Sequence, residues 1–284
     1  MTPVVGEALA VGRARLCAAG IAAADLEARV LLERAADIDR AALLARLREP
    51  LDTCAVERYQ RLLERRSRRV PLAYLTGERE FWSLRLAVDA RVLVPRPETE
   101  TLVEAALARL GPAARVADVG TGSGAVAIAL AVERPGAAVW AVDRCAAALA
   151  AARANAAAHG VAARIVFLEG DLASPLEPLG ASLDAVVANL PYIPSGEIAL
   201  LQPEVRDHEP RIALDGGPDG LALISRLVAQ TPRVVQGGGW LLLEVGAGQA
   251  PAVSALVRAT AAFASVETLG DLAGIGRVVA ARLR

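Results

Sequence analysis

The residues with the clearest chemical potential form the tetrapeptide Asn189-Leu190-Pro191-Tyr192. The segment before it, 183–188, has the apolar composition of a strand that is covered on both faces of a parallel sheet. The tetrapeptide therefore stands where a buried strand should end. An amide oxygen, backbone carbonyls and an aromatic ring at such a position suit the transfer of a methyl group to a planar nitrogen.

The chemical reason lies in the weakness of such a nitrogen. An NH2 group conjugated to a carbonyl or a ring is a poor nucleophile, because its lone pair is delocalised. Two hydrogen-bond acceptors can hold both hydrogens, direct the lone pair at the methyl donor and stabilise the positive charge that develops. The candidates are the Asn189 side-chain oxygen and the Leu190 carbonyl, which can face the site because a residue before proline favours extended backbone. We expect Tyr192 to pack against the flat group.

A glycine loop upstream predicts a nucleoside site. It follows the predicted strand 115–119 and opens a helix, so its free backbone amides can approach a ligand at the helix N-terminus. Asp143 ends the next predicted strand, where a carboxylate can accept both ribose hydroxyls of an adenosine. Asp171 and Leu172 stand at the end of the third predicted strand and can contact the adenine. The loop residues assigned to cofactor binding are Asp118, Gly120, Thr121, Gly122, Ser123 and Gly124.

Several alternatives are open at this point. Because Ala125 follows, the loop also satisfies the dinucleotide pattern G-x-G-x-x-G/A, which keeps a nicotinamide-dependent dehydrogenase, a tight turn without a ligand and a non-catalytic cofactor-binding protein in view. Nothing at the fourth strand end resembles a hydride-transfer acid. An adenine N6-methyltransferase acting on RNA or DNA shares the chemistry, but a net charge of −1 and 3% aromatic residues weigh against it.

Composition excludes other classes. All 31 basic residues are arginine, which excludes a Walker-type phosphate loop, a pyridoxal Schiff base and a lysine nucleophile. With 2 histidines a multi-histidine metal centre is excluded, and we expect no metal. There is no early basic cluster, and Glu7 interrupts the first apolar stretch, so we expect no signal peptide, no membrane segment and a cytoplasmic protein.

The elements that must position these residues fall into three parts. Residues 1–72 have the spacing of amphipathic helices and predict a helical domain. Residues 73–95 alternate like a strand pair that links two domains. Residues 96–284 alternate strands with helices, which predicts a doubly wound α/β sheet. We predict its strands at 115–119, 138–142, 164–168, 184–188 and 240–245, with an edge hairpin at 265–269 and 277–280.

Taken together, these motifs resemble those of the release-factor glutamine methyltransferases. The most specific matches are Pro95-Arg-Pro-Glu-Thr99 and the segment that begins with Glu209-Pro210. The resemblance runs in order from about residue 70 to the end. Its segments are 71–77 with Phe81, 92–100, 118–124, Asp143, 184–189, 209–214 with the glycines at 216, 217 and 220, 244–246 with Gln249, and 271–274 with Arg277-Val278.

This resemblance implies a seven-stranded, Rossmann-like class I methyltransferase domain, a small all-helical N-terminal domain and a linking β-hairpin. It implies S-adenosylmethionine as donor, with S-adenosylhomocysteine as product. The acceptor would be the side-chain nitrogen (N5) of the glutamine in the Gly-Gly-Gln motif of bacterial class I peptide chain release factors. Residues 120–124, Asp143, Leu172 and Asn189 would bind the cofactor, and 189–192, Arg96 and Glu209 the substrate. We expect a monomer whose partner is the release factor, without direct nucleic-acid binding.

One residue departs from the family pattern. The family usually has Asn-Pro-Pro-Tyr, whereas Asn-Leu-Pro-Tyr resembles the ribosomal RNA adenine dimethyltransferases. Leu190 removes a ring-locked φ and adds an N–H but keeps the carbonyl, so we expect glutamine as substrate. The arginines between 58 and 69 are interspersed with glutamates, which favours a solvated helix face over a docking surface.

Overall fold

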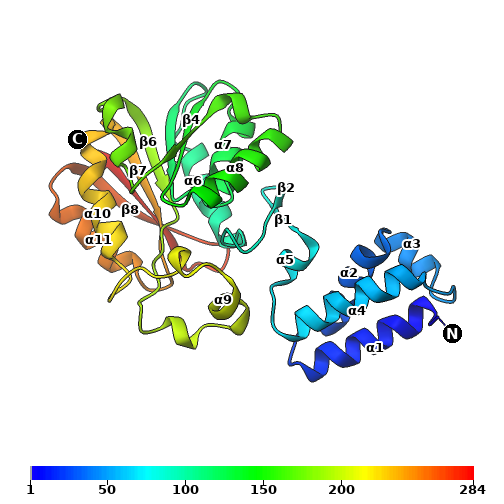
Figure 1. Cartoon of the computed structure of the whole chain (residues 1–284). Coiled ribbons are helices and arrows are strands. Elements are labelled where there is room, and N and C mark those ends of the chain that lie inside the picture. The colour runs from blue at the N-terminus through cyan, green and yellow to red at the C-terminus, as the bar shows by residue number, and fades with distance from the viewer. Residues whose placement is uncertain (1) are drawn as a thin grey trace. The chain divides into compact units, whose positions relative to one another are not determined.

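The computed structural model describes residues 2–284, which form two compact units (Figure 1). The first contains the chain as far as Glu78 together with the distant segment Gln202–His208. The second contains Arg79–Leu201 and Glu209–Arg284. Within residues 2–284, no helix is both long and apolar enough to cross a membrane.

The first unit is helical, as the amphipathic spacing predicted. Its core is built on fully buried leucines such as Leu16, Leu31 and Leu63. Asp52 is the N-cap of the fourth helix and accepts a hydrogen bond from the Ala55 N–H at 3.0 Å. The helices are α1 Val5–Ala18, α2 Ala24–Ala36, α3 Arg40–Ala45, α4 Thr53–Ser67, α5 Leu72–Thr76 and α9 Pro203–His208.

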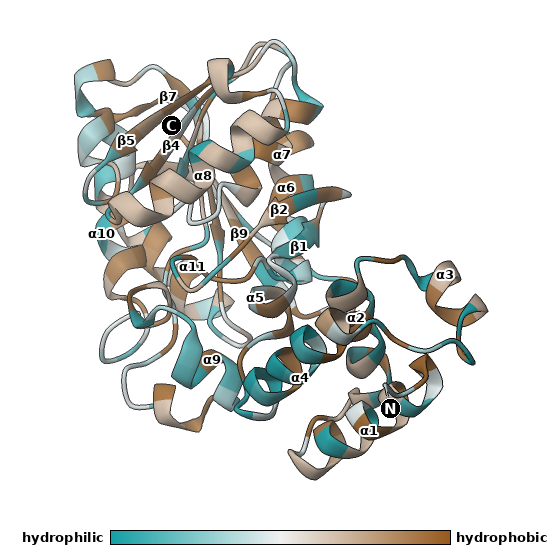
Figure 2. Cartoon of the chain, turned by 45° about the vertical axis from the view of Figure 1, so that its right-hand side comes forward, coloured by the Kyte–Doolittle hydropathy of each residue, from teal (hydrophilic) through white to brown (hydrophobic). Residues whose placement is uncertain are grey.

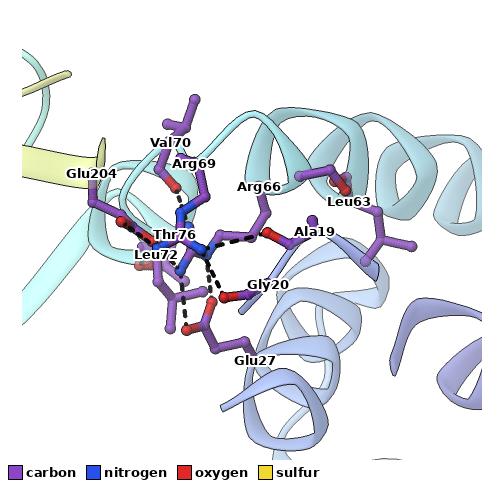
Figure 3. A network of polar contacts seen from close by, with 11 residues as sticks. Ala19, Gly20, Glu27, Leu63, Arg66, Arg69, Val70, Leu72, Thr76 and Glu204 are labelled. Atoms are coloured by element: carbon purple, nitrogen blue, oxygen red, sulfur yellow. Dashed lines mark hydrogen bonds and ion pairs between the residues drawn. The ribbon is translucent and has the colours of Figure 1, made fainter. Parts of the chain in front are cut away.

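Two arginines attach α9 to the other helices (Figure 3). Arg66 is 5% exposed and donates to Glu27 and, at 2.9 Å, to Glu204. Arg69 donates to the other Glu204 oxygen at 2.8 Å. Figure 2 shows that α4 is otherwise rich in hydrophilic residues. Part of the arginine-rich stretch is therefore a buried ion-pair network, which the sequence analysis did not anticipate.

The predicted strand pair is shorter than expected. It consists of β1 (Glu78–Phe81) and β2 (Leu84–Ala87), joined by Trp82 and Ser83 at left-handed φ values of 52° and 58°. The expectation of strand from residue 73 was wrong, because α5 occupies that segment. Gly77, with φ 82°, ends α5 in the left-handed conformation that glycine adopts most readily.

The second unit is built on a seven-stranded sheet in the order β5-β4-β3-β6-β7-β9-β8. Its strands run parallel except β9, which lies antiparallel between β7 and β8 as part of the predicted edge hairpin. The strands are β3 Arg115–Val119, β4 Ala138–Asp143, β5 Ile165–Glu169, β6 Leu183–Ala188, β7 Val235–Glu244, β8 Phe263–Gly270 and β9 Gly276–Leu283. The helices are α6 Glu100–Leu107, α7 Ala125–Glu133, α8 Ala146–Ala158, α10 Ala222–Gln230 and α11 Ala250–Ala259.

Helices cover both faces of this sheet, with α6, α7 and α8 on one side and α10 and α11 on the other (Figure 1). Residues of β6 alternate between the two cores: Ala185 and Val187 face one, Val186 and Ala188 the other. All four are fully buried. The predicted fold class, a doubly wound sheet with a helical N-terminal domain and a hairpin, is confirmed.

The register aligns the ends of the central strands. Val119 of β3 pairs with Val142 of β4 and with Ala188 of β6, and Ala188 in turn pairs with Leu243 of β7. The segments that leave these four strands therefore begin level with one another at the carboxyl edge of the sheet, which is where open α/β sheets bind ligands.

A buried asparagine on α8 ties the hairpin to the glycine loop. Asn155 is 2% exposed; its side chain accepts from the Ala87 N–H at 2.8 Å and donates to the Ala87 carbonyl at 3.0 Å and the Ser123 carbonyl at 2.9 Å. These bonds satisfy three backbone groups at once.

We predict that Asn155→Ala lowers the free energy of unfolding by about 3 kcal/mol, because it leaves three backbone groups without their partner. Urea titration measures the loss. The control Ala157→Asn puts the same side chain on the exposed face of α8 and should cost less than about 1 kcal/mol. Equal losses for the two variants would contradict the role given to Asn155.

Candidate active site

The glycine loop at the end of β3 is held in place by the buried side chain of Asp118. This carboxyl is 2% exposed, and its Oδ2 accepts from the Thr121 hydroxyl at 2.7 Å and from the Ala127 N–H at 3.1 Å. Burial raises the pKa of Asp118 to about 7, although the two hydrogen bonds oppose that shift. Asp118 therefore shapes the loop from inside the protein.

Two glycines of this loop serve different purposes. Gly120, at φ 80°, lies so close to the tetrapeptide that an added Cβ would be 3.1 Å from Leu190 Cδ2. At Gly122, with φ 55°, an added Cβ would meet no atom within 4 Å and would instead enter open space. The loop thus packs against the second motif at one point and leaves room for a ligand at the other.

Asp143 stands at the end of β4 beside this loop. Its carboxylate accepts from the Gly122 and Cys145 N–H groups, each at 2.9 Å. Burial raises its pKa, and the backbone hydrogen bonds act in the opposite direction. Past β5, Leu172 is buried in left-handed backbone at φ 51°, while exposed Asp171 forms an ion pair with Arg226.

The tetrapeptide follows β6 as predicted. Asn189 donates from Nδ2 to the Thr99 hydroxyl at 3.1 Å, and Thr99 is 5% exposed. Leu190 is 4% exposed and belongs to the core beneath the loop. The carbonyl of Tyr192 accepts from Gln249 Nε2 at 2.8 Å, and burial raises the pKa of the Tyr192 hydroxyl to about 12.

A segment after Pro210 supports the tetrapeptide, a role that sequence reasoning did not assign to it. Gly216 donates to the Ile193 carbonyl at 2.9 Å. Gly220 has φ 76°, and an added Cβ would lie 2.2 Å from the Tyr192 carbonyl oxygen. The spaced glycines at 216, 217 and 220 were the signal that could have revealed this close approach.

A cleft opens between these loops. Most of the predicted site residues line it, namely Gly120, Gly122, Asp143, Asp171, Leu172, Asn189, Leu190 and Pro191. Asp118, Thr121 and Ser123 are buried behind them, and Gly124 begins α7. Sequence reasoning missed further lining residues, which include Arg91, Val92, Arg144, Ile212 and Leu223.

Three further predicted residues also do not line this cleft. Tyr192 packs against the core of that face and over Gly246, whose added Cβ would be 3.2 Å from the Tyr192 ring. Arg96 donates to Glu209 Oε1 at 2.7 Å. Glu209 is 6% exposed, its Oε2 has no hydrogen-bond partner, and burial raises its pKa. Arg96 and Glu209 thus form an ion pair with each other, and their assignment to substrate binding stays a prediction.

The parallel sheet with antiparallel β9, together with the glycine-loop cleft at its carboxyl edge, defines a class I methyltransferase with S-adenosylmethionine as its methyl donor. The hMettl16 catalytic domain, solved with the MAT2A 3'UTR hairpin 6, shares this fold with a TM-score of 0.58 at 14% identity over 70% of this chain and 76% of that one.

Two family descriptions match the chain: the PrmC N-terminal domain over residues 7–77 and the methyltransferase small domain over residues 97–201. The release factor glutamine methyltransferase of Moorella thermoacetica is 46% identical, with 95% of each chain covered. That of Geobacter sulfurreducens is 42% identical over 95% of this chain and 94% of its own. That of Cereibacter sphaeroides is 46% identical over 98% of both. The chain belongs to the release factor glutamine methyltransferase family, which confirms the predicted family and methyl donor.

The raised pKa of Asp118 makes stability depend on pH. Folding raises this pKa from 3.8 to about 7, so the folded protein favours the protonated form. The contribution of the protonated Asp118 carboxyl to the free energy of unfolding is complete below pH 3.8 and is lost as the pH rises through about 7. Between these limits we predict that the wild type loses up to about 1.4 kcal/mol per pH unit relative to Asp118→Asn. Unfolding titrations at several pH values measure the difference.

Asparagine is a suitable replacement because its side-chain oxygen can still accept from Thr121 and Ala127. The exposed Glu197→Gln serves as a matched neutralisation and should follow the wild-type pH curve. If the Asp118→Asn curve runs parallel to that of the wild type, Asp118 does not titrate as described.

Proposed function

We propose that this protein transfers the methyl group of S-adenosylmethionine to the side-chain nitrogen N5 of the glutamine in the Gly-Gly-Gln motif of bacterial class I peptide chain release factors. The observation that carries the proposal is the orientation of Asn189. Its NH2 group is engaged by Thr99, so its oxygen is available to a substrate NH2 in the cleft that Asn189 lines. We further propose that it acts as a cytoplasmic monomer that contacts the release factor and no nucleic acid directly.

The residues of the cleft fit the cofactor. Asp143 offers a carboxylate to ribose hydroxyls, and the open side of Gly122 leaves space over the loop backbone. Leu172 offers an apolar surface to an adenine ring, and Asp171 an acceptor for its amine. When bound, S-adenosylmethionine supplies an electrophilic methyl group on a sulfonium sulfur.

The chain's own task is to hold the glutamine amide. Asn189 Oδ1 and the Leu190 carbonyl accept its two N–H groups, which orients the lone pair and stabilises the positive charge that develops on nitrogen. The hydrogen bond from Gln249 to the Tyr192 carbonyl fixes the end of the tetrapeptide. The two acceptors, Asn189 Oδ1 and the Leu190 carbonyl, are therefore in position before the substrate binds. No strong base is required, because methyl transfer first gives an N-protonated cation, which is strongly acidic and releases one proton to water to leave the neutral N-methylated amide.

The test is transfer of labelled methyl from S-adenosylmethionine to a purified class I release factor, and to the same factor with its Gly-Gly-Gln glutamine replaced. The proposal predicts labelling of the first protein and none of the second. Equal labelling of both, or labelling of RNA or DNA with neither protein labelled, would contradict it.

For Asn189→Ala we predict a loss of turnover of at least about 10²-fold, the scale on which one preorganised polar group acts in a transition state. Cofactor affinity should fall much less, because the cleft keeps its other lining residues. Steady-state methylation and equilibrium binding of S-adenosylmethionine separate the two effects. Near-normal turnover would refute the role of Asn189.

For Leu190→Pro we predict turnover within a few-fold of the wild type, because the carbonyl at this position is kept. Stability should fall by about 1–2 kcal/mol, since the buried leucine loses packing. Methylation assays below the melting temperature of the variant, combined with urea titration, measure both. A large loss of turnover in the folded variant would show that the leucine side chain itself matters to the reaction.

A further inference from the structure

Glu244 is a buried carboxyl at the edge of the site for which the reaction as described has no use. It is the last residue of β7 and is 2% exposed. Its Oε2 is buried without a hydrogen-bond partner. Burying a charged group in this way is costly, so its presence calls for a physical reason.

The sheet register places Glu244 next to the first residue of the tetrapeptide, Asn189. Ala188 of β6 pairs with Leu243 of β7, so Asn189 and Glu244 are the next residues along two neighbouring parallel strands. Thr99 lies against both of them: it accepts the Asn189 N–H at 3.1 Å, and its hydroxyl and the Asn189 amide are hydrogen-bonding neighbours of the Glu244 carboxyl.

The direction of these hydrogen bonds follows from the chemistry of each group. An ionised carboxylate only accepts hydrogen bonds. The Thr99 hydroxyl must therefore give its single hydrogen to Glu244, which leaves its lone pairs for the Asn189 NH2 group. Asn189 then has to present its oxygen, and not its NH2 group, to the cleft.

We propose that Glu244 is a positioning residue that, directly and through Thr99, fixes the Asn189 side-chain amide with its oxygen toward the substrate. The inference rests on the proposed function and deepens it. A neutral side chain in place of the carboxylate can donate to Thr99, which then donates to Asn189 Oδ1. That reversal turns the Asn189 NH2 group toward the substrate NH2, where two donors meet and neither is satisfied.

Glu244→Gln tests this directly because it keeps the shape and removes the obligate acceptor. Assays at about pH 8.5 keep wild-type Glu244 ionised, since burial raises its pKa to about 7. We expect turnover on the release factor to fall at least about 10-fold, with affinity for S-adenosylmethionine within about 3-fold of the wild type. The melting temperature should stay equal or rise, because the cost of burying a carboxylate whose Oε2 has no hydrogen-bond partner is removed.

A double-mutant cycle separates positioning from general structural damage. In the Asn189→Ala background there is no amide left to orient, so Glu244→Gln should cost less than about 3-fold in single-turnover methylation. Thr99→Val should lower turnover in the same direction as Glu244→Gln, and Thr99→Ser should recover most of what Thr99→Val loses. Glu104→Gln, the same neutralisation on the exposed side of α6, should leave turnover unchanged.

The outcomes separate the two proposals. Unchanged turnover in Glu244→Gln, or the same fold loss with and without Asn189, overturns the positioning role while methylation by the wild type stands. Failure of the wild type to label the release factor overturns the proposed function, and the positioning role with it.

Discussion

The constraint on which the site depends is the level register of four parallel strands. Val119, Val142, Ala188 and Leu243 pair with one another across β3, β4, β6 and β7, and the functional segments follow directly. Because both faces of this sheet are buried, a slip of one residue would exchange the side chains of the two cores and is strongly disfavoured. The core packing therefore also fixes the positions of the residues that line the cleft.

Along this edge several carboxyl groups are buried, which lowers the stability of the folded protein. Asp118 and Glu244 have burial-raised pKa values near 7, and Glu209 and Glu244 each carry an oxygen without a partner. Two of these groups orient parts of the site. Asp118 orients the glycine loop, and Glu244 orients the hydrogen bond between Thr99 and Asn189. Such a cluster is typical of a site whose polar groups are positioned before the substrate binds. These groups lower the stability of the folded protein locally, and the packing of the apolar cores compensates for that loss.

The sequence was most informative where the signal is local. Strand 115–119 was predicted to the residue, and the glycine loop, Asp143 and Asn189 were placed at one edge because parallel strands require it. It was least informative where partners are distant in the chain. The attachment of Gln202–His208 to the helical unit and the pairing of Arg96 with Glu209 depend on folding that no local pattern encodes. Helix α5 was missed because the alternation of apolar residues that begins near Phe81 was extended back to residue 73.

The identity of this enzyme's substrate comes down to a single atom, the acceptor of the methyl group. The most direct measurement is mass spectrometry of a release factor digested after incubation with the enzyme and S-adenosylmethionine, with fragmentation that locates the added methyl. We predict one methyl group, on the side-chain nitrogen of the Gly-Gly-Gln glutamine. A methyl group on any other residue, with that glutamine unmodified, would contradict it.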